Sequence, residues 1–380
     1  MNVLLVNWLD PENPMAGGAE IHLFEIFGRL ASRGHRIRLV CSGWKDCARR
    51  TTIQGIDIQR VAGRYSFALR ARRAVRKAIS REPPDVIVED INKLPLFLAA
   101  HCDLPYSVLV PHLFGPTAFL ELAWPLATIV WLAERPVPRH YREAGFHAIS
   151  ESTRDDLVAR GVSSDRIRVI HPGVDSRRYS PGSGLDRTAW PSFLYVGRLK
   201  RYKGIDHAIR ALALARRGRR DITLDIAGTG DARKELEQLA DSLGLRDAVR
   251  FLGFVTEEDK LRLLRTVWAN IFPSVKEGWG ITIMEAAACG TPSIASHSPG
   301  LRDSVRDGET GFLVPHGDAA ALAKRMVQLA EAPSLVTRLG MQARLHAESF
   351  TWEQAAAATE AHLQHIVEVR RQTSTQILEA

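Results

Sequence analysis

Short apolar runs alternate with longer amphipathic segments through the first half of the chain. Each run is bounded by turn residues, which is typical of buried β-strands. The segment AEIHLFEIFGRLASRGH has the apolar spacing of a helix and ends at Gly34, so we expect a helix with a glycine C-cap. This alternation predicts a parallel sheet with helices on both faces. The strands are expected at 3–7, 37–42, 56–61, 85–90, 106–111 and 146–150.

The second half of the chain repeats this pattern. Helices are expected at 231–243 and 256–266, and the tail from Thr351 onward is also helical. The segment 171–187 is rich in Gly, Pro and Ser and lacks periodicity, so we interpret it as a linker. The strands of this half are expected at 192–198, 222–228, 249–254, 269–274 and 292–296.

Together the two halves predict an α/β fold of two doubly wound, Rossmann-like domains that face a central cleft. The length of 380 residues supports two cores rather than one. We expect a first domain at 1–175, a second at 176–351, and a C-terminal helix at about 352–380 that packs back on the first. Ligands of such sheets bind at the carboxyl ends of the strands.

Composition adds an expected partner and compartment. The net charge of +8 and the pI of about 9.5 indicate an anionic partner, which can be nucleic acid, a membrane surface or a phosphorylated small molecule. Four scattered cysteines lack metal-ligand spacing, so we expect free thiols in a reducing compartment. The start MNVLLVNWLD lacks the features of a signal peptide and predicts a buried strand. The predicted location is therefore cytoplasmic.

Two loops at predicted strand ends have residues suited to phosphate. In NPMAGGAE, Gly17 and Gly18 precede a helix that we expect to begin near Ala19, where bare backbone amides attract anions. A flexible turn is the alternative, since neither the dinucleotide nor the P-loop glycine spacing is present. In VGRLKRYKG, Arg198 and Lys203 can converge on one diphosphate, although a solvated basic turn has the same composition.

A third loop, VKEGWG, precedes a helix that we expect to begin near Ile281. The amides of Gly280, Ile281 and Thr282 would form another anion site. Glu277 and Glu285 would stand roughly 12 Å apart in a continuous helix, beyond the about 5–9.5 Å of glycosidase carboxyl pairs. Two acceptors beside an anion site suit a nucleotide-sugar. The alternative is a surface glutamate and an unrelated helix-face charge.

Several motifs in this order resemble the C-terminal domain of retaining GT-B glycosyltransferases of family 4. The resemblance is strong over about 190–350, and in the first half it extends to the glycine-rich loop, VPHLFGP and AISESTRDDL. Trp279 stands where this family usually has phenylalanine, and HPG at 171–173 stands where PNG is common. The motifs of the second half are GRLKRYKG, AGTGD, FLGFV, PSVKEGWGITIMEAAACGTPSIA and DGETGFLV.

The resemblance implies a role for each matching residue. Glu285 would bind the donor ribose, and Glu277 would face the sugar hydroxyls near the anomeric carbon. Arg198 and Lys203 would hold the diphosphate, and His112 would lie near sugar and acceptor, although a lone histidine at a strand end is more often structural. The implied donor-binding residues are Gly17, Gly18, Gly228, Gly230, Phe254, Val255, Gly278, Trp279, Gly280, Ile281, Thr282 and Glu285. Among these, Gly18 would reach the phosphates as the cleft closes, Gly228 and Gly230 would let the backbone pass the nucleotide, and Phe254 and Val255 would lie beside the base.

The implied reaction is transfer of a hexose from a UDP- or GDP-sugar to a glycan or lipid-linked acceptor, with retention of anomeric configuration. No DxD-like pair stands at a suitable strand end, so we expect no metal or other cofactor, and the cations would stabilise the leaving diphosphate.

The segment 60–81 has eight basic residues and no acid, with apolar residues at helical spacing. It predicts a helix on an anionic membrane surface, such as the inner face of the plasma membrane, although a solvated helix face is the alternative. The apolar stretch 118–133 could add an interfacial segment, but we favour its assignment to the core of the first domain. A nucleotide-sugar epimerase or hydrolase of the same fold remains a rival, as does a non-catalytic nucleotide-sugar or nucleic-acid binding protein. No nucleic-acid module is recognised, so we expect no nucleic-acid partner.

Overall fold

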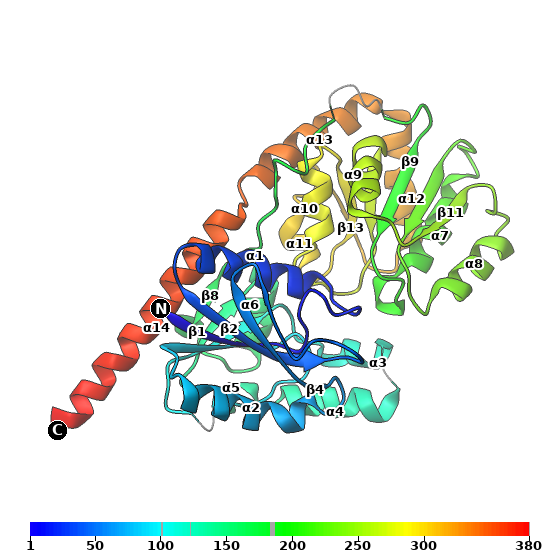
Figure 1. Ribbon diagram of the computed structural model, residues 1–380. Helices are drawn as coiled ribbons and strands as arrows, with labels where there is room; N and C mark the ends of the chain where they lie inside the picture. The colour runs from blue at the N-terminus through cyan, green and yellow to red at the C-terminus, as the bar shows by residue number, and fades with distance from the viewer. Residues whose placement is uncertain (100–101, 122, 183–186, 380) are drawn as a thin grey trace. The chain divides into compact units, whose positions relative to one another are not determined.

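The computed structural model describes residues 1–99, 102–121, 123–182 and 187–379, so part of the predicted linker, 183–186, lies outside the described residues. The chain divides into two compact units (Figure 1). The first unit comprises Met1–Ala118, Leu122–Gly173 and Trp352–Ala380, and the second comprises Phe119–Glu121 and Val174–Thr351.

The first unit is built on a mainly parallel sheet with the order β3-β4-β2-β1-β5-β6-β7-β8. Its central strands are apolar without interruption, because both faces of the sheet are covered. Val3 and Leu5 of β1 point to one face and Leu4 to the other. The strands are β1 (Asn2–Val6), β2 (Arg36–Gly43), β3 (Arg50–Ile53), β4 (Ile56–Gly63), β5 (Val86–Asp90), β6 (Tyr106–Val110), β7 (Gly145–Ala148) and β8 (Ile167–Val169).

Helices cover both faces of this sheet. The face of Val3 packs against α1 (Gly18–Ser32) and α14 (Trp352–Glu379), and the face of Leu4 packs against α2 (Phe67–Arg81), α5 (Val137–His140) and α6 (Glu151–Ala159). The remaining elements are α3 (Ala118–Glu121), α4 (Trp124–Glu134) and the 3-10 turns η2 (Gly115–Thr117) and η3 (Ser164–Arg166). Helix α1 ends before Gly34, whose φ of 89° suits a glycine after a helix, as expected.

The second unit has a parallel sheet with the order β11-β10-β9-β12-β13-β14. This is the doubly wound order, with its reversal between β9 and β12. The strands are β9 (Ser192–Val196), β10 (Thr223–Ala227), β11 (Val249–Gly253), β12 (Ala269–Phe272), β13 (Ser293–Ser296) and β14 (Gly311–Val314). The helices are η4 (Arg201–Lys203), α7 (Ile205–Ala215), α8 (Arg233–Ser242), α9 (Glu257–Thr266), α10 (Ile281–Ala288), α11 (Leu301–Ser304), α12 (Ala319–Glu331) and α13 (Pro333–Glu348).

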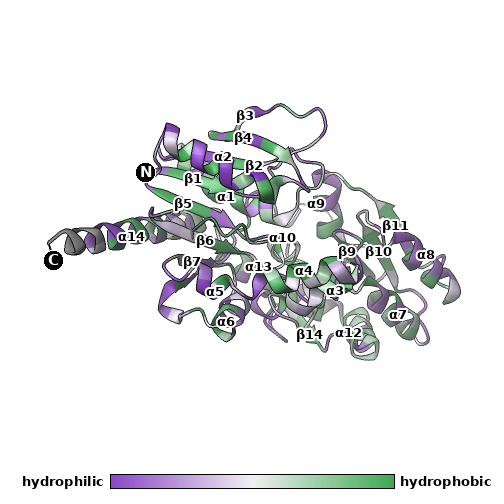
Figure 2. Ribbon diagram, turned by 90° about the horizontal axis from the view of Figure 1, so that it is seen from below, coloured by the Kyte–Doolittle hydropathy of each residue, from purple (hydrophilic) through white to green (hydrophobic). Residues whose placement is uncertain are grey.

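The prediction of two parallel-sheet α/β domains is confirmed, but two assignments in the first were wrong. Residues 60–63 belong to β4, and helix α2 begins only at Phe67. The stretch 118–133 is not core, because α4 exposes Trp124 at 73% and Leu126 at 56%. Figure 2 shows green, hydrophobic colour along α4. Among the described residues, no helix is both long and apolar enough to cross a bilayer.

The C-terminal helix α14 belongs to the first unit, where it packs along α1. Trp352 and Leu363 are buried in the cluster that also holds Phe27 of α1. At the edge, Glu360 accepts hydrogen bonds from Arg33 at 2.8 Å and from His35 at 2.7 Å. A stripe of buried apolar residues flanked by charged pairs therefore fixes this helix.

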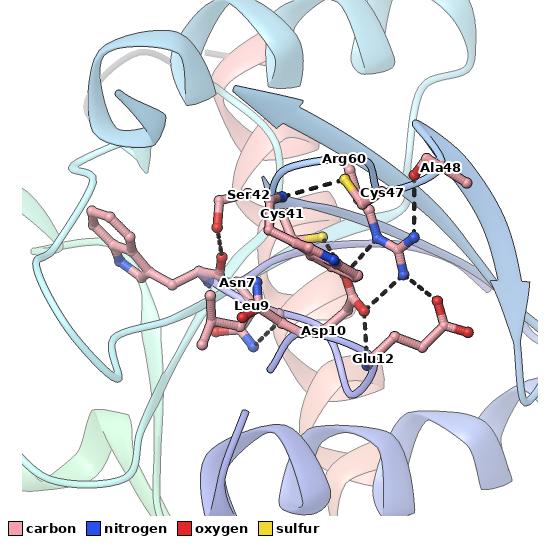
Figure 3. Close-up of polar contacts among 12 residues, drawn as sticks. Asn7, Leu9, Asp10, Glu12, Cys41, Ser42, Cys47, Ala48 and Arg60 are labelled. Atoms are coloured by element: carbon pink, nitrogen blue, oxygen red, sulfur yellow. Dashed lines mark hydrogen bonds and ion pairs between the residues drawn. The ribbon is translucent and has the colours of Figure 1, made fainter. Parts of the chain in front are cut away.

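A buried ion pair fixes the loop between β1 and α1 (Figure 3). The carboxylate of Asp10 accepts from Arg60 Nε at 2.8 Å and from its Nη2 at 2.9 Å. Both side chains are almost fully buried, and the same guanidinium reaches Glu12 at 2.7 Å and the carbonyl of Ala48 at 3.1 Å. The side chain of Arg60 is therefore part of the buried interior and not of the exposed basic surface that the sequence predicted.

We predict that Arg60→Met lowers the free energy of unfolding by about 3–5 kcal/mol, because it leaves the carboxylate of Asp10 buried without its cation. Urea denaturation monitored by circular dichroism measures the change. The matched control is Arg76→Met on the exposed face of α2, where we expect a change within about 0.5 kcal/mol. Equal stability of the two variants would contradict a structural role for the pair.

Candidate functional site

The strand order of the second unit places three loops at one edge of its sheet. The strand order reverses between β9 and β12, and ligands of doubly wound sheets bind beside such a reversal at the carboxyl ends of the strands. The loop 197–204 follows β9, the loop 228–232 follows β10, and the loop 273–280 follows β12. Three loops predicted to contact the donor therefore meet at the expected place.

Backbone hydrogen bonds join the loops after β9 and β10. The amide of Leu199 donates to Thr229 at 2.9 Å, and the amide of Ala232 donates to Leu199 at 3.1 Å. A Cβ on Gly228 would lie 1.9 Å from the Gly197 carbonyl oxygen, and one on Gly230 would lie 2.1 Å from that of Leu199. These glycines allow the two loops to approach each other closely. This contact explains why glycine is needed at both positions, whereas the resemblance attributed them to contact with the nucleotide.

The loops after β9 and β12 are joined in the same way. The amide of Val275 donates to the carbonyl of Tyr202 at 3.0 Å. Gly204 has a left-handed φ of 64°, and a Cβ there would lie 2.4 Å from the carbonyl oxygen of Pro273. Only glycine fits such a position without strain. This contact aims the preceding residue, Lys203, toward the loop after β12.

Lys203 and Glu277 form a largely buried ion pair. The ammonium Nζ lies 2.6 Å from Glu277 Oε1, and the two side chains are 10% and 13% exposed. The ammonium also lies 4.9 Å from the ring centroid of Tyr202 and 5.4 Å from that of Phe272. Burial alone would lower the pKa of Lys203, but the carboxylate of Glu277 outweighs it and raises that pKa above its usual value. Lys203 therefore carries its charge at neutral pH.

Arg198 lies in the same loop and is exposed. Its carbonyl oxygen accepts a hydrogen bond from the phenol of Tyr195 at 2.9 Å, which fixes the backbone at this point. Its positive charge is near enough to Lys203 to oppose the rise in that residue's pKa. Within the part of the chain that the structure describes, the guanidinium makes no hydrogen bond or ion pair. Two cations thus converge, one buried and paired, the other open to a ligand.

Helix α10 begins beside this pair, with Gly280 as its N-cap. The side chains of the described residues provide no cap for its first turn, so the amides of Ile281 and Thr282 stay available to an anion. Gly278 is buried in the preceding loop. The helix start therefore adds partial positive charge to that of the two cations.

Glu285 lies one turn further along α10 and has its own lysine partner. Lys260 Nζ of α9 lies 3.0 Å from Glu285 Oε1 and 3.0 Å from Glu257 Oε1. The phenol of Tyr179 donates to Glu257 Oε2 at 2.7 Å. Burial raises the pKa of Glu285, and the ammonium of Lys260 limits that rise.

The aromatic residues predicted at this site have different surroundings. Trp279 is 2% exposed and packs against Phe350, with ring centroids 5.3 Å apart, so its ring belongs to the interior and cannot line a donor site. That Trp279 binds the donor stays a prediction, which its backbone rather than its ring would have to fulfil. Phe254 is 80% exposed just after β11, and Val255 beside it is half-buried. Phe254 therefore offers an open ring face at the sheet edge.

The glycine-rich loop of the first unit leads into α1. The amide of Gly17 donates to Glu20 Oε2 at 2.7 Å and is therefore already satisfied. Gly18 is the first residue of the helix, and its amide makes no hydrogen bond with the described residues. Only the second of the two predicted amides is thus free for a phosphate.

His112 lies in the loop after β6, and its ring packs edge-on against Phe114 at 5.2 Å. A buried carboxylate holds this loop, because Glu134 of α4 accepts from the amides of Phe114 at 2.6 Å and Gly115 at 2.7 Å. Arg160 lies 3.5 Å from the same carboxylate. These contacts hold the loop in place, and His112 at the start of the loop is half-exposed.

Three of these residues were missed by sequence analysis. The sequence contained an indication for Glu134, because it is an acidic residue at the end of an apolar stretch. Burying such a carboxylate is costly unless hydrogen-bond donors surround it, so a bound loop could have been expected there. Asp10 and Lys260 carried none, because their partners lie 50 and 25 positions away. Across the residues that the structure describes, no group of three or more His, Cys, Asp or Glu side chains could hold a metal ion.

The arrangement in the second unit is suited to a diphosphate flanked by hydroxyl groups. Arg198, Lys203 and the start of α10 supply positive charge, and carboxylates stand at both ends. A group that binds at the centre is anionic, and groups that bind at the flanks can donate hydrogen bonds.

Comparison with known proteins identifies the family of each half of the chain. The model of glycosyl transferases group 1 matches residues 186–346, and that of glycosyltransferase family 4 matches residues 16–178. A D-inositol 3-phosphate glycosyltransferase of Streptomyces scabiei is 37% identical over 249 residues, which cover 61% of this chain and 54% of that protein. A glycogen synthase of Mycobacterium tuberculosis is 35% identical over 212 residues, covering 55% of this chain and 51% of that protein. The chain spans about half the length of these curated relatives.

Solved structures share the fold over nearly the whole chain. A sucrose-phosphate synthase from Thermosynechococcus elongatus superposes with a TM-score of 0.80 at 22% identity and covers 99% of both chains. HepE from Anabaena, solved with UDP and glucose, gives a TM-score of 0.76 at 19% identity over 96% of this chain and 100% of its own. The two family matches, one in each half, and this shared architecture place the chain in the group 1 (family 4) GT-B glycosyltransferases.

Proposed function

We propose that the chain is a retaining glycosyltransferase that moves a hexose from a UDP- or GDP-sugar to a hydroxyl group of a glycan or lipid-linked acceptor. The observation that carries this proposal is the buried Lys203–Glu277 pair, 2.6 Å apart at the sheet reversal, with Arg198 open beside it. A pair of this kind offers a cation to the diphosphate and a carboxylate to the sugar within one hydrogen-bond length.

The proposed reaction breaks the bond between the anomeric carbon and the phosphate oxygen and forms one to the acceptor oxygen. Negative charge develops on the departing diphosphate, where Arg198, Lys203 and the α10 amides stabilise it. The proton of the acceptor hydroxyl passes to the departing phosphate oxygen. Glu277 accepts from the sugar hydroxyls, and Glu285 accepts from the ribose.

The printed names of the relatives support the class of substrates. The curated relatives include a D-inositol 3-phosphate glycosyltransferase and a glycogen synthase, and HepE was solved with UDP-glucose. The first name gives a glycosyltransferase of D-inositol 3-phosphate, and the HepE title names UDP-glucose as the bound ligand. For this chain we assign acceptor binding to the first unit, near His112 and Gly18.

The first unit also has features of a membrane-contacting surface, and we place the enzyme on the cytoplasmic face of an anionic membrane. Helix α2 buries Phe67, Ala71, Val75 and Ala78 and exposes all six of its basic residues. Helix α4 exposes Trp124, Leu126, Ile129 and Leu132. Both helices lie along the lower edge of the first unit in Figure 1. Basic and apolar surface together favour anionic lipid.

The experiment that tests the function is a two-part screen. Thermal shift with UDP, GDP, ADP and their common sugars identifies the donor, and turnover is then followed with and without hydroxyl acceptors. We expect stabilisation by one nucleotide family and release of nucleotide that depends on acceptor. Release at the same rate without acceptor would favour a hydrolase or epimerase of this fold.

We predict that Arg198→Ala lowers kcat about 10²- to 10³-fold, because it removes one cation from the developing diphosphate charge. Steady-state kinetics with the identified donor measure this, and circular dichroism checks the fold. Arg201→Ala is the matched control from the same loop, since Arg201 is 71% exposed and pairs with Glu235. Near-normal turnover of Arg198→Ala would refute its role.

We predict that the protein floats with vesicles of anionic phospholipid at low salt and is largely released at high salt, because screening weakens the attraction of α2. The triple variant Arg72→Glu/Arg73→Glu/Arg76→Glu should not float. Arg210→Glu/Arg217→Glu/Arg220→Glu makes the same change of charge on exposed arginines of the second unit and should float normally. Absence of wild-type flotation at both salt concentrations would remove the membrane proposal.

A further inference from the structure

Lys260 is the ammonium that contacts Glu285, and neither the motifs nor the predicted site includes it. It lies on α9, outside the loops at the sheet edge, and is 12% exposed. Its Nζ bridges Glu257 Oε1 and Glu285 Oε1 at 3.0 Å each, and it also lies 5.2 Å from the ring centroid of Tyr179. Such a lysine is held on several sides and has little freedom to leave.

Glu285 itself is left half-satisfied by this arrangement. Its side chain is 8% exposed, and Lys260 engages only Oε1. Among the described residues, Oε2 is buried and accepts no hydrogen bond. Leaving a buried carboxylate oxygen without a donor is costly, which indicates that another donor completes the site. A pair of adjacent hydroxyl groups, as on a ribose, supplies such donors.

We propose that Lys260 is a positioning residue that keeps Glu285 oriented and ionised, and that through this contact the protein prefers ribonucleotides over nucleotides without ribose hydroxyls. The inference rests on the proposed function, because it takes Glu285 as the ribose-binding carboxylate. A charged carboxylate accepts hydrogen bonds from two hydroxyls, whereas its protonated form must donate at one oxygen. Lys260 therefore acts on the ribose through Glu285 and does not touch it.

The other groups around Glu285 act on it differently from Lys260. Glu257 is a second carboxylate, which raises the pKa of Glu285 further. Tyr179 lowers that pKa as a neutral hydrogen-bonding neighbour, while its phenol proton is donated to Glu257 Oε2 at 2.7 Å. The thiol of Cys289 lies near enough to feel the charge of Glu285, and burial raises the pKa of that thiol to about 12. Of these neighbours, only Lys260 favours the charged carboxylate by a positive charge.

The experiment measures binding by isothermal titration calorimetry, with UDP, GDP and the 2′,3′-dideoxy form of each as probes. For Lys260→Met we expect the Kd of the preferred ribonucleotide to rise about 10- to 100-fold, as for loss of a hydrogen bond to a charged group. The dideoxy form should bind wild type and variant equally, because it makes no contact with Glu285. Lys260→Arg should recover most of the affinity, and Lys324→Met, on the exposed face of α12, should change nothing.

A pH series separates positioning from a merely structural role. Since the pKa of Glu285 is already raised by burial, ribonucleotide binding should weaken as pH falls through that pKa. Removing the ammonium raises this pKa further, so the loss of binding in Lys260→Met should begin at a higher pH than in wild type. Equal weakening for the ribose and dideoxy forms, or an unchanged pH profile, would overturn the role of Lys260. Failure of wild type to bind either ribonucleotide would instead overturn the donor site itself.

Discussion

The ion pair between Lys203 and Glu277 constrains the site of the second unit most strongly. Each group has lost most of its contact with water, and a buried pair of this kind often contributes little net stability. The pair exists because two loops meet at the reversal of strand order, where Gly204 lets the backbone after β9 touch the backbone after β12. The ion pair is therefore explained by the positioning of Lys203 rather than by a gain in stability. The result is a lysine that is already fixed and already charged before any ligand binds.

The two glutamates of the KEGWGITIMEA stretch have the same kind of partner, since each forms a largely buried ion pair with a lysine. Glu277 precedes α10 and pairs with Lys203, and Glu285 lies inside α10 and pairs with Lys260. In each case the lysine comes from another element and engages Oε1. Each lysine thus holds a largely buried carboxylate in place through a single oxygen. The spacing of the glutamates sets the distance between two hydrogen-bond acceptors, and the uncapped start of α10 lies between them.

The parts of the structure that sequence analysis predicted depend on local pattern, and the parts it missed depend on contacts between distant segments. Uninterrupted apolar runs located β1, β5 and β9, whereas the edge strands β3, β8 and β14 were missed. β3 and β8 are short and contain polar residues, and β14 is an apolar run of only four residues. Arg60 counted as one more basic residue in a basic segment, because nothing local indicates that Asp10 lies beneath it. Trp279 fitted a loop motif, but nothing local indicates that its ring is buried against Phe350.

The distribution of charge explains why the basic composition says little about the site. Lys203 and Lys260 are matched by carboxylates, so they add no net charge where the donor would bind. The uncompensated positive charge instead gathers on the exposed face of α2, opposite the buried side chains of Phe67 and Val75. Beyond these matched pairs, the exposed Arg198 and the start of α10 leave positive charge at the site. An anion there would be attracted by one open cation and held by geometry at short range. The net charge of the chain consequently describes mainly its surface, because the buried lysine–carboxylate pairs cancel out in the charge count.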